Sequence, residues 1–242
     1  MSESGETGHT ATGTPAMVIF DVNETLSDLG PLADSFERIG LTRSAVEPWF
    51  AGVLRDGFAL TVVGVRPRFA DLASEALRVR LVAGGAGEPH PVSDVAPDVE
   101  SSVDEVMRTF ASLSVQSDVV DGVHALQELG VRLVTLSNGS AALARGLLKR
   151  AGLEDAFETL MSVEDAAHWK PHPASYAHAL DVCGVSAADA MLVAVHPWDI
   201  DGAARAGLRT GWLNRNGARY PNYFMTPDVV ATDLVGLAGA LR

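Results

Sequence analysis

The chain has 242 residues, of which 47% are hydrophobic and 20% are charged, a balance typical of globular proteins and not of disordered ones. The 31 acidic residues outnumber the 18 basic ones, and the resulting net charge of −13 argues against partners such as nucleic acid or anionic membranes. The single cysteine, Cys183, excludes an internal disulfide framework and suits a reducing cytoplasm, and no apolar run reaches the roughly 20 residues that span a bilayer.

Several short apolar runs occur along the chain, and each is followed by a polar residue. The polar stretch 1–15, rich in Gly, Thr and Ser, predicts a disordered tail, and it is followed by the apolar run 16–20, which ends at Asp21. Continuous runs of this kind predict strands buried on both faces of a sheet. Comparable runs, the last of them weaker, lie at 131–136, 190–195, 209–213 and 158–163.

Helical hydrophobic patterns separate these predicted strands, as at Val119, Val123 and Leu126. Strands that alternate with helices predict an α/β fold, with a Rossmann-like parallel sheet covered by helices on both faces. Ligands of such sheets bind beyond the carboxyl ends of the strands. The polar residues at those ends are therefore the candidate functional residues.

The interval 27–117 contains no convincing strand. Instead, apolar residues at helical spacing predict three or more amphipathic helices, around residues 49–58, 69–79 and 99–110. A helical insertion after the first strand of a parallel sheet is expected to form a cap over the strand ends. We therefore predict a core made of residues 16–29 and 114–242 and a cap made of residues 30–113.

Asp21 is the first candidate, because the chain leaves a buried strand at this carboxylate and Thr25 follows four residues later. A carboxylate in this place can act as a nucleophile, oriented by the threonine hydroxyl and by backbone donors of the loop. The alternative is that Asp21 only caps a turn, which is a common use of aspartate.

Three further groups of polar residues follow later strands. Ser137 and Asn138 offer hydrogen-bond donors just before a predicted helix start that favours an anion. Lys170 precedes the helix that Pro173 can start, and its alternative role is an ordinary solvated surface charge. Asp199 supplies a second carboxylate, for which helix N-capping is the alternative.

In this order and spacing, Asp21, Ser137, Lys170 and Asp199 resemble the four motifs of the haloacid dehalogenase superfamily, from Val18 onward. The helical insertion directly after the first motif is similar to the superfamily's first type of cap. The resemblance implies that Asp21 is the nucleophile and that the other three motif residues surround it.

The residue at position 23 helps to distinguish the phosphatases of the superfamily from its dehalogenases. Phosphatases have an acid at this position that protonates the leaving alcohol, and they hold Mg²⁺ with carboxylates of the first and fourth motifs. Asn23 is not an acid, and Asp199 lacks the acidic pair usual in Mg²⁺ sites.

The segment 49–61 also looks like the cap of 2-haloacid dehalogenases, where an arginine meets the substrate; the matching residue is Arg55. The resemblance thus favours the type II, or L-2-haloacid dehalogenase, subfamily.

Two positions depart from the better known members of that subfamily. They read Ser-x-Asn where this chain has Ala194-Val-His196, and they usually carry Tyr at the position of Asn23. For His196 three roles stay open: orienting a carboxylate, changing the size of the halide pocket, or plain packing.

The resemblance implies hydrolysis of short 2-haloalkanoic acids, such as haloacetates (fluoroacetate is a candidate) and 2-halopropionates, to 2-hydroxy acids through an aspartyl ester. Asp199 would activate the water, and Lys170 would keep both carboxylates ionised. Ser137 and Asn138 would bind the substrate carboxylate, and Arg55 with Asn138 would receive the halide. The other expected pocket residues are Tyr176, His196, Trp198 and Asn23.

We expect no cofactor and no metal, a small halogenated acid and water as the partners, and we leave a homodimer open. Two alternatives remain at this point. One is a phosphatase that depends on Mg²⁺, and the other is a non-catalytic member that binds a small acid in the same pocket.

Overall fold

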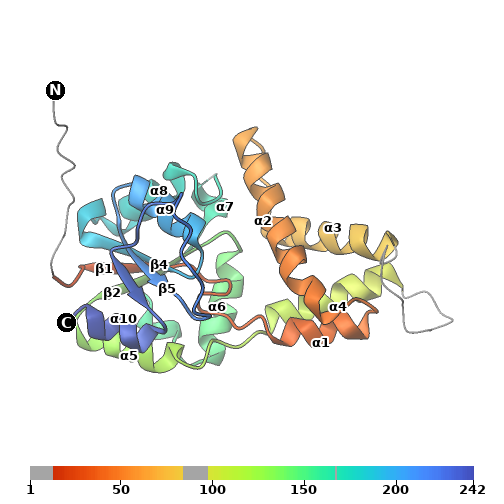
Figure 1. The fold of residues 1–242 in the computed structure, drawn as a ribbon, viewed down its shortest axis with the longest axis horizontal. Coiled ribbons are helices and arrows are strands. Elements are labelled where there is room, and N and C mark those ends of the chain that lie inside the picture. The colour runs from red at the N-terminus through yellow and green to blue at the C-terminus, as the bar shows by residue number, and fades with distance from the viewer. Residues whose placement is uncertain (1–12, 84–97, 167) are drawn as a thin grey trace.

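The computed structural model describes residues 13–83, 98–166 and 168–242. Most of the predicted tail, residues 1–12, lies outside the described residues. The chain forms an α/β core and a helical cap that lie side by side (Figure 1). The predicted fold class is therefore confirmed.

The core contains a six-stranded sheet in the order β3-β2-β1-β4-β5-β6, and every neighbouring pair is parallel. All the predicted strand regions form strands, and β6, which is short and carries the exposed Val230, was not predicted. The strands are β1 (Met17–Phe20), β2 (Arg132–Ser137), β3 (Thr159–Ser162), β4 (Ala190–Ala194), β5 (Arg209–Leu213) and β6 (Val229–Ala231).

Side chains of β1 alternate between two separate hydrophobic layers, because successive residues of a strand point to opposite faces. Met17 and Ile19 pack with helices α8 and α9 and with the cap, whereas Val18 and Phe20 pack with α5, α6 and α10. The helices of the core are α5 (Val119–Glu128), α6 (Ala141–Arg150), α7 (Val163–Ala166), α8 (Pro173–Cys183), α9 (Pro197–Arg205) and α10 (Leu234–Ala240), with the 3-10 turns η2 (Glu154–Ala156) and η3 (Ala187–Asp189).

The cap follows β1 and precedes α5. Buried aromatic rings hold it together, with edge contacts of Trp49 to Phe36 and to Phe110. One cap helix, α1, was not predicted, although it starts at a proline and buries Leu32 and Phe36 on one face. The cap elements are α1 (Pro31–Arg38), η1 (Arg43–Ala45), α2 (Val46–Val62), α3 (Phe69–Val82) and α4 (Val99–Ala111).

The two connections between core and cap run beside each other. Ser27 and Val115 form an antiparallel bridge, and backbone hydrogen bonds join Asp28 N to Ser114 O (2.9 Å) and Gln116 N to Leu26 O (2.8 Å). The chain therefore enters and leaves the cap at one place, next to the loop that carries Asp21.

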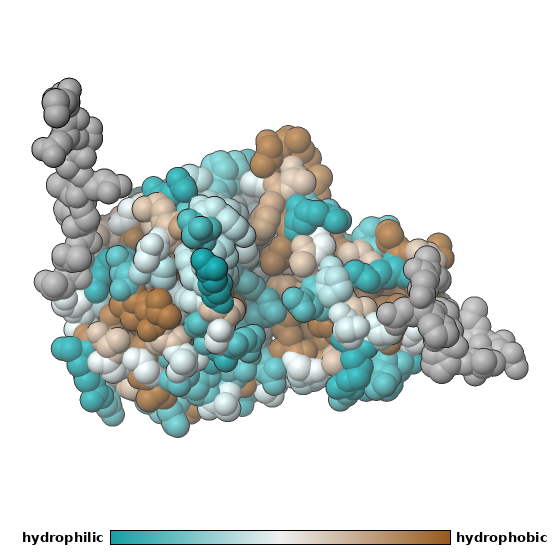
Figure 2. Space-filling model, in the orientation of Figure 1, coloured by the Kyte–Doolittle hydropathy of each residue, from teal (hydrophilic) through white to brown (hydrophobic). Residues whose placement is uncertain are grey.

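The end of α2 projects beyond the rest of the cap and exposes apolar side chains (Figure 2), with Val62 85% and Val63 71% exposed. Among the described residues, no helix has the length and hydropathy needed to cross a membrane.

Gly57 of α2 allows the cap to approach the core closely. A Cβ atom at this position would lie 2.3 Å from the ring of Trp169, which is buried and donates a hydrogen bond to Pro67 O (2.9 Å). The indole therefore occupies the space that any larger residue at this position would need.

We predict that Gly57→Ala lowers the unfolding free energy by about 1–3 kcal/mol, because the Trp169 ring is confined and overpacking strains a core. Gly52→Ala is the matched control on the same helix, since a Cβ there meets nothing within 4 Å and alanine is the better helix former by up to about 1 kcal/mol. Urea unfolding of both variants measures the effect. Equal stability of the two would contradict the close approach.

Candidate active site

The candidate residues gather at the carboxyl edge of the sheet because β1 lies between β2 and β4. Asp21 follows β1, Ser137 ends β2, and Asp199 lies in the first turn of α9 after β4. Lys170 reaches the same place from the loop before α8. The topology thus brings together four residues that are far apart in the chain.

Lys170 joins the two aspartates. Its Nζ donates hydrogen bonds to Asp21 Oδ1 (3.0 Å) and to Asp199 Oδ2 (2.6 Å), and its side chain is 0% exposed. The alternative of a solvated surface lysine is therefore wrong.

Burial and charge act differently on the two aspartates. Burial raises the pKa of Asp21, but the charge of Lys170 and a hydrogen bond from Thr25 oppose it, and the pKa is lowered overall. Burial raises the pKa of Asp199, and the charge of Asp21 adds to this, so the pKa stays raised despite Lys170. Burial alone would lower the pKa of Lys170, but the two carboxylates raise it. Asp21 is therefore set as an ionised group and Asp199 as the group that accepts a proton more readily.

Two hydroxyl groups fix the orientation of the carboxylates. Thr25 Oγ1 donates to Asp21 Oδ2 (2.7 Å) and accepts from Val195 N (3.1 Å). Tyr176 donates through its hydroxyl to Asp199 Oδ1 (2.6 Å), and burial together with Asp199 raises the pKa of this phenol well above its ordinary value. His196, and not Asp199, is the N-cap residue of α9, so the helix-capping alternative for Asp199 is wrong.

Asn138 positions Lys170. Its Nδ2 donates to Lys170 O (3.1 Å) and its Oδ1 accepts from Lys170 N (2.9 Å), so both ends of the amide hold the backbone of the lysine. One of the two Nδ2 hydrogens is thus committed to Lys170 O, and the contacts of Asn138 with substrate carboxylate and halide stay predictions. Ser137 Oγ accepts from Gly139 N (2.9 Å), and a Cβ at Gly139 would contact both Ser137 Oγ and Asn23 Nδ2, which places Asn23 beside this turn.

An aromatic stack surrounds His196. The imidazole is nearly parallel to the rings of Phe50 of the cap (centroids 6.4 Å apart, planes at 21°) and Trp198 of α9 (5.1 Å, 20°). Trp198 in turn contacts the edge of Phe58 on the cap (4.9 Å). Two of the expected pocket residues, Tyr176 and Trp198, lie at the site, against Asp199 and His196 respectively, whereas Trp49 is buried in the cap, where its Nε1 donates to Ala73 O (3.1 Å).

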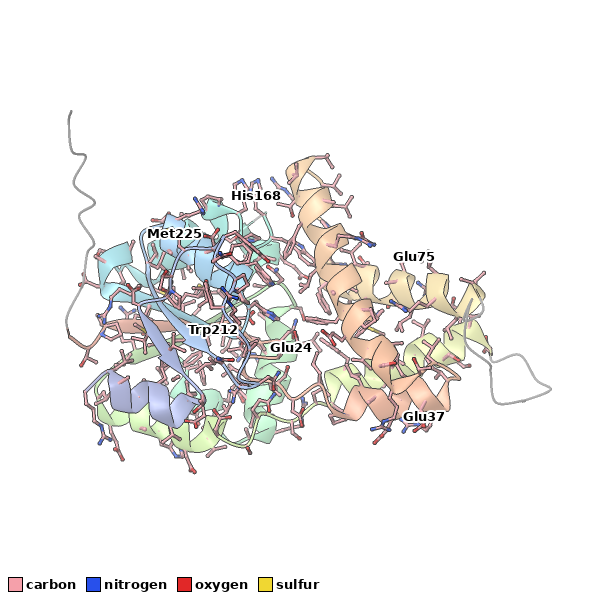
Figure 3. All side chains as sticks on the ribbon, in the orientation of Figure 1. Glu24, Glu37, Glu75, His168, Trp212 and Met225 are labelled. Carbon is pink, nitrogen blue, oxygen red and sulfur yellow. The ribbon has the colours of Figure 1, made fainter. Side chains whose placement is uncertain are left out.

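Glu24 is a site residue that the sequence interpretation missed. Its Oε2 lies 3.3 Å from His196 Nε2, and it occupies the boundary between core and cap (Figure 3). Burial raises the pKa of its carboxyl group, with the nearby charge of Asp21 adding to the effect. Glu24 has a positive φ of 63°, whereas the other described residues with positive φ are glycines. No pattern in the sequence around Glu24 predicts its contact with His196 or its positive φ.

Arg55 is not brought to the other predicted residues. Its guanidinium pairs with the neighbouring Asp56 (2.8 Å), and its side chain is 76% exposed. The inward face of α2 carries Phe50, Leu54 and Gly57, at helical spacing, and Arg55 follows one residue after an inward position, which turns it to solvent. The predicted halide contact of Arg55 is therefore corrected: Phe50 is the cap residue that faces His196.

The donor set of the site does not fit a Mg²⁺ ion. Both oxygens of Asp199 accept hydrogen bonds from Tyr176 and Lys170, and both oxygens of Asp21 accept from Thr25 and Lys170. Over the described ranges 13–83, 98–166 and 168–242, no group of three or more His, Cys, Asp or Glu is arranged to hold a metal.

Comparison with known proteins identifies the family of the chain. A family model described as a haloacid dehalogenase-like hydrolase matches residues 16–207, so the chain belongs to this family of hydrolases.

The haloacetate dehalogenase H-2 of Moraxella sp. (strain B) is 27% identical over 214 residues, which cover 87% of this chain and 91% of that protein. The (S)-2-haloacid dehalogenase of Xanthobacter autotrophicus is 29% identical over 200 residues, covering 82% and 74%. The core and cap also superpose on the L-2-haloacid dehalogenase structure from Xanthobacter autotrophicus with covalently bound chloropropionic acid, with a TM-score of 0.82, 25% identity and coverage of 94% and 98%.

We predict that Lys170→Met destabilises the protein by about 3–5 kcal/mol, because two buried carboxylates then lose their shared cation. Their pKa values would rise above those of the unfolded chain, and a carboxyl group that binds its proton more tightly when folded loses stability as the pH rises. The loss should therefore be larger at about pH 8 than at about pH 5.

Urea unfolding at both pH values tests this dependence. Arg205→Met removes the exposed ion pair with Asp201 and serves as the control, for which we expect little change at either pH. A Lys170→Met variant whose stability did not fall between the two pH values would contradict the electrostatic role of Lys170.

Proposed function

We propose that the protein is a hydrolytic dehalogenase of short 2-haloalkanoic acids and that it forms an aspartyl ester on Asp21. The observation that carries the proposal is the position of Lys170 Nζ between Asp21 and Asp199, because it provides an ionised nucleophile and a separate proton acceptor in one buried site. The haloacetate and (S)-2-haloacid dehalogenases among its relatives support the reaction type.

In the first step, a carboxylate oxygen of Asp21 attacks C2 of the substrate from the side opposite the halogen. The carbon–halogen bond breaks, the halide leaves with the electron pair, and an ester joins Asp21 to the acid. Thr25 and Lys170 hold the carboxylate in a fixed orientation, so that little reorganisation is needed before attack.

In the second step, water adds to the carbonyl carbon of the Asp21 ester and gives up a proton to Asp199. The bond between that carbonyl carbon and the ester oxygen breaks, and the leaving oxygen takes the proton back from Asp199 to give the 2-hydroxy acid. The new carboxyl group of Asp21 loses the second water proton to solvent, which restores its carboxylate. The raised pKa of Asp199 suits it to accept this proton, and the Tyr176 hydroxyl holds its other oxygen.

The alternative of a Mg²⁺-dependent phosphatase has less support. Asn23 cannot supply the acid that a leaving alkoxide needs in a phosphatase, and no group of three or more His, Cys, Asp or Glu side chains among the described residues is arranged to hold the ion. The third possibility, binding of a small acid without turnover, is tested by the same experiment as the reaction itself.

We predict that the wild-type protein releases bromide from bromoacetate in EDTA, with no phosphate release from phosphate esters in Mg²⁺. Asp21→Asn should reduce turnover by at least about 10³-fold, because an amide is a poor nucleophile of nearly the same shape. Asp199→Asn should let the ester accumulate, which intact-protein mass spectrometry detects. Asp201→Asn, on the same helix and paired with Arg205, is the control that keeps turnover.

An Asp21→Asn variant with a normal rate would eliminate the proposed nucleophile. Loss of activity in EDTA that Mg²⁺ restored would favour phosphoryl transfer, and ligand binding without any halide release would favour a non-catalytic role.

We further predict that Tyr176→Phe moves the acidic limb of the kcat–pH profile to higher pH. The hydrogen bond from Tyr176 lowers the pKa of Asp199, so its removal raises that pKa and the base ionises only at higher pH. Tyr220→Phe is the control, because its hydroxyl donates to Met225 O (2.9 Å) instead of to Asp199. A profile unchanged by Tyr176→Phe would remove Asp199 from the rate-limiting proton transfer.

A further inference from the structure

His196 and Glu24 form a titratable pair that the two proposed steps do not use. His196 Nε2 lies 3.3 Å from Glu24 Oε2 and 3.8 Å from Asp21 Oδ2. Both distances exceed the usual length of a strong N–H···O bond, so the nitrogen stands near two carboxylates without being fully committed to either. The Nε2 atom of His196 therefore lies beside the proposed nucleophile, Asp21.

Among the described residues, no arginine or lysine of the cap forms an ion pair with Asp21. Among the residues that the structure describes, Asp21 has ion-pair contacts with Lys170 and His196 and accepts a further hydrogen bond from Thr25. The cap residue that faces His196 is Phe50, and Arg55 points to solvent. Lys170 is already held by two aspartates, so a departing anion needs another donor.

We propose that His196, oriented by Glu24, donates a hydrogen bond to the departing halide and so allows the site to release fluoride. This inference rests on the proposed dehalogenation and names a substrate class for it, the short 2-fluoroalkanoic acids. As the carbon–fluorine bond breaks, the electron pair goes to fluoride, which accepts the Nε2–H of His196 while the proton stays on the ring.

Fluoride gains most from such a donor. It is the smallest halide and the strongest hydrogen-bond acceptor, and it leaves from the strongest carbon–halogen bond, so its departure depends on stabilisation that bromide needs far less. A donor placed in a buried site, where water screens charge poorly, gives the largest effect on the developing anion.

Packing holds the donor in place. The near-parallel rings of Phe50 and Trp198 limit rotation of the His196 side chain, which is 13% exposed. Glu24, 38% exposed, reaches the imidazole from a backbone conformation that non-glycine residues rarely adopt, and such strain commonly accompanies a functional position.

A polar cavity of about 760 Å³ adjoins the pair. Glu24 and His196 line one part of it, and Asn214, Arg215 and Asn216 line another. The same lining also carries Asp28, Asp118 and Asp233, so acidic groups outnumber basic ones around this cavity.

The test measures fluoride release from fluoroacetate and bromide release from bromoacetate by the full-length protein and four variants. His196→Phe keeps an aromatic ring in the stack but has no donor, and His196→Gln keeps a side-chain N–H. Glu24→Gln removes the partner charge. Glu47→Gln is the matched control, because it neutralises a nearby acid that lines a pocket with Glu24 and Phe50 but without His196.

We expect His196→Phe to lower kcat for fluoroacetate by at least about 10²-fold and kcat for bromoacetate by less than about tenfold. His196→Gln should recover part of the fluoride release, and Glu24→Gln should give a smaller loss with the same preference for fluoride. Glu47→Gln should leave both rates near those of the wild type.

Equal losses for both halides in His196→Phe would show a structural role and overturn the inference. Bromide release by the wild type without fluoride release would also overturn it, while leaving the proposed function intact. If the folded wild type, checked by circular dichroism, released neither halide, the proposed function itself would fail.

Discussion

The ion pairs of Lys170 with Asp21 and Asp199 are the interaction on which the rest of the site depends. Two carboxylates that are buried this close together cannot both stay ionised without a cation between them. Surrounding contacts serve this arrangement: Asn138 holds the backbone of the lysine, and Thr25 and Tyr176 each hold one carboxylate. The polar residues of the sheet edge thus form one connected hydrogen-bond network, in which each carboxylate oxygen of Asp21 and Asp199 has a protein donor.

The sequence predicts the centre of this network well because Asp21, Ser137 and Lys170 stand directly after a strand, at the end of a strand or shortly before a helix. Asp21 and Ser137 are placed by the ends of β1 and β2, and parallel neighbours bring such ends together. The strand runs themselves are recognisable because both faces are buried. For the same reason β6, which is short and half exposed, gives no comparable pattern.

Residues of the cap are harder to place from the sequence. Assigning a cap residue to the site requires the register of a helix to within one residue, and one residue separates the inward Leu54 from the outward Arg55 on α2. Glu24 presents a different difficulty, because its position depends on a loop conformation with a positive φ that ordinary side chains rarely adopt. Contacts that depend on register or on an unusual backbone angle therefore became known only from the structure.

The paired connections at Ser27 and Val115 have a consequence for how such a chain can vary. Backbone hydrogen bonds join the two ends of the helical insertion at the rim of the core. The insertion is therefore a closed loop for the sheet, and the positions of its two ends do not depend on its length. Loop-closure entropy grows only slowly with loop length, so the thermodynamic cost of exchanging one insertion for another is small. The strands and the charged residues at their ends can thus be retained while the cap is replaced. The reaction and the selectivity for a substrate can therefore change independently of each other during evolution.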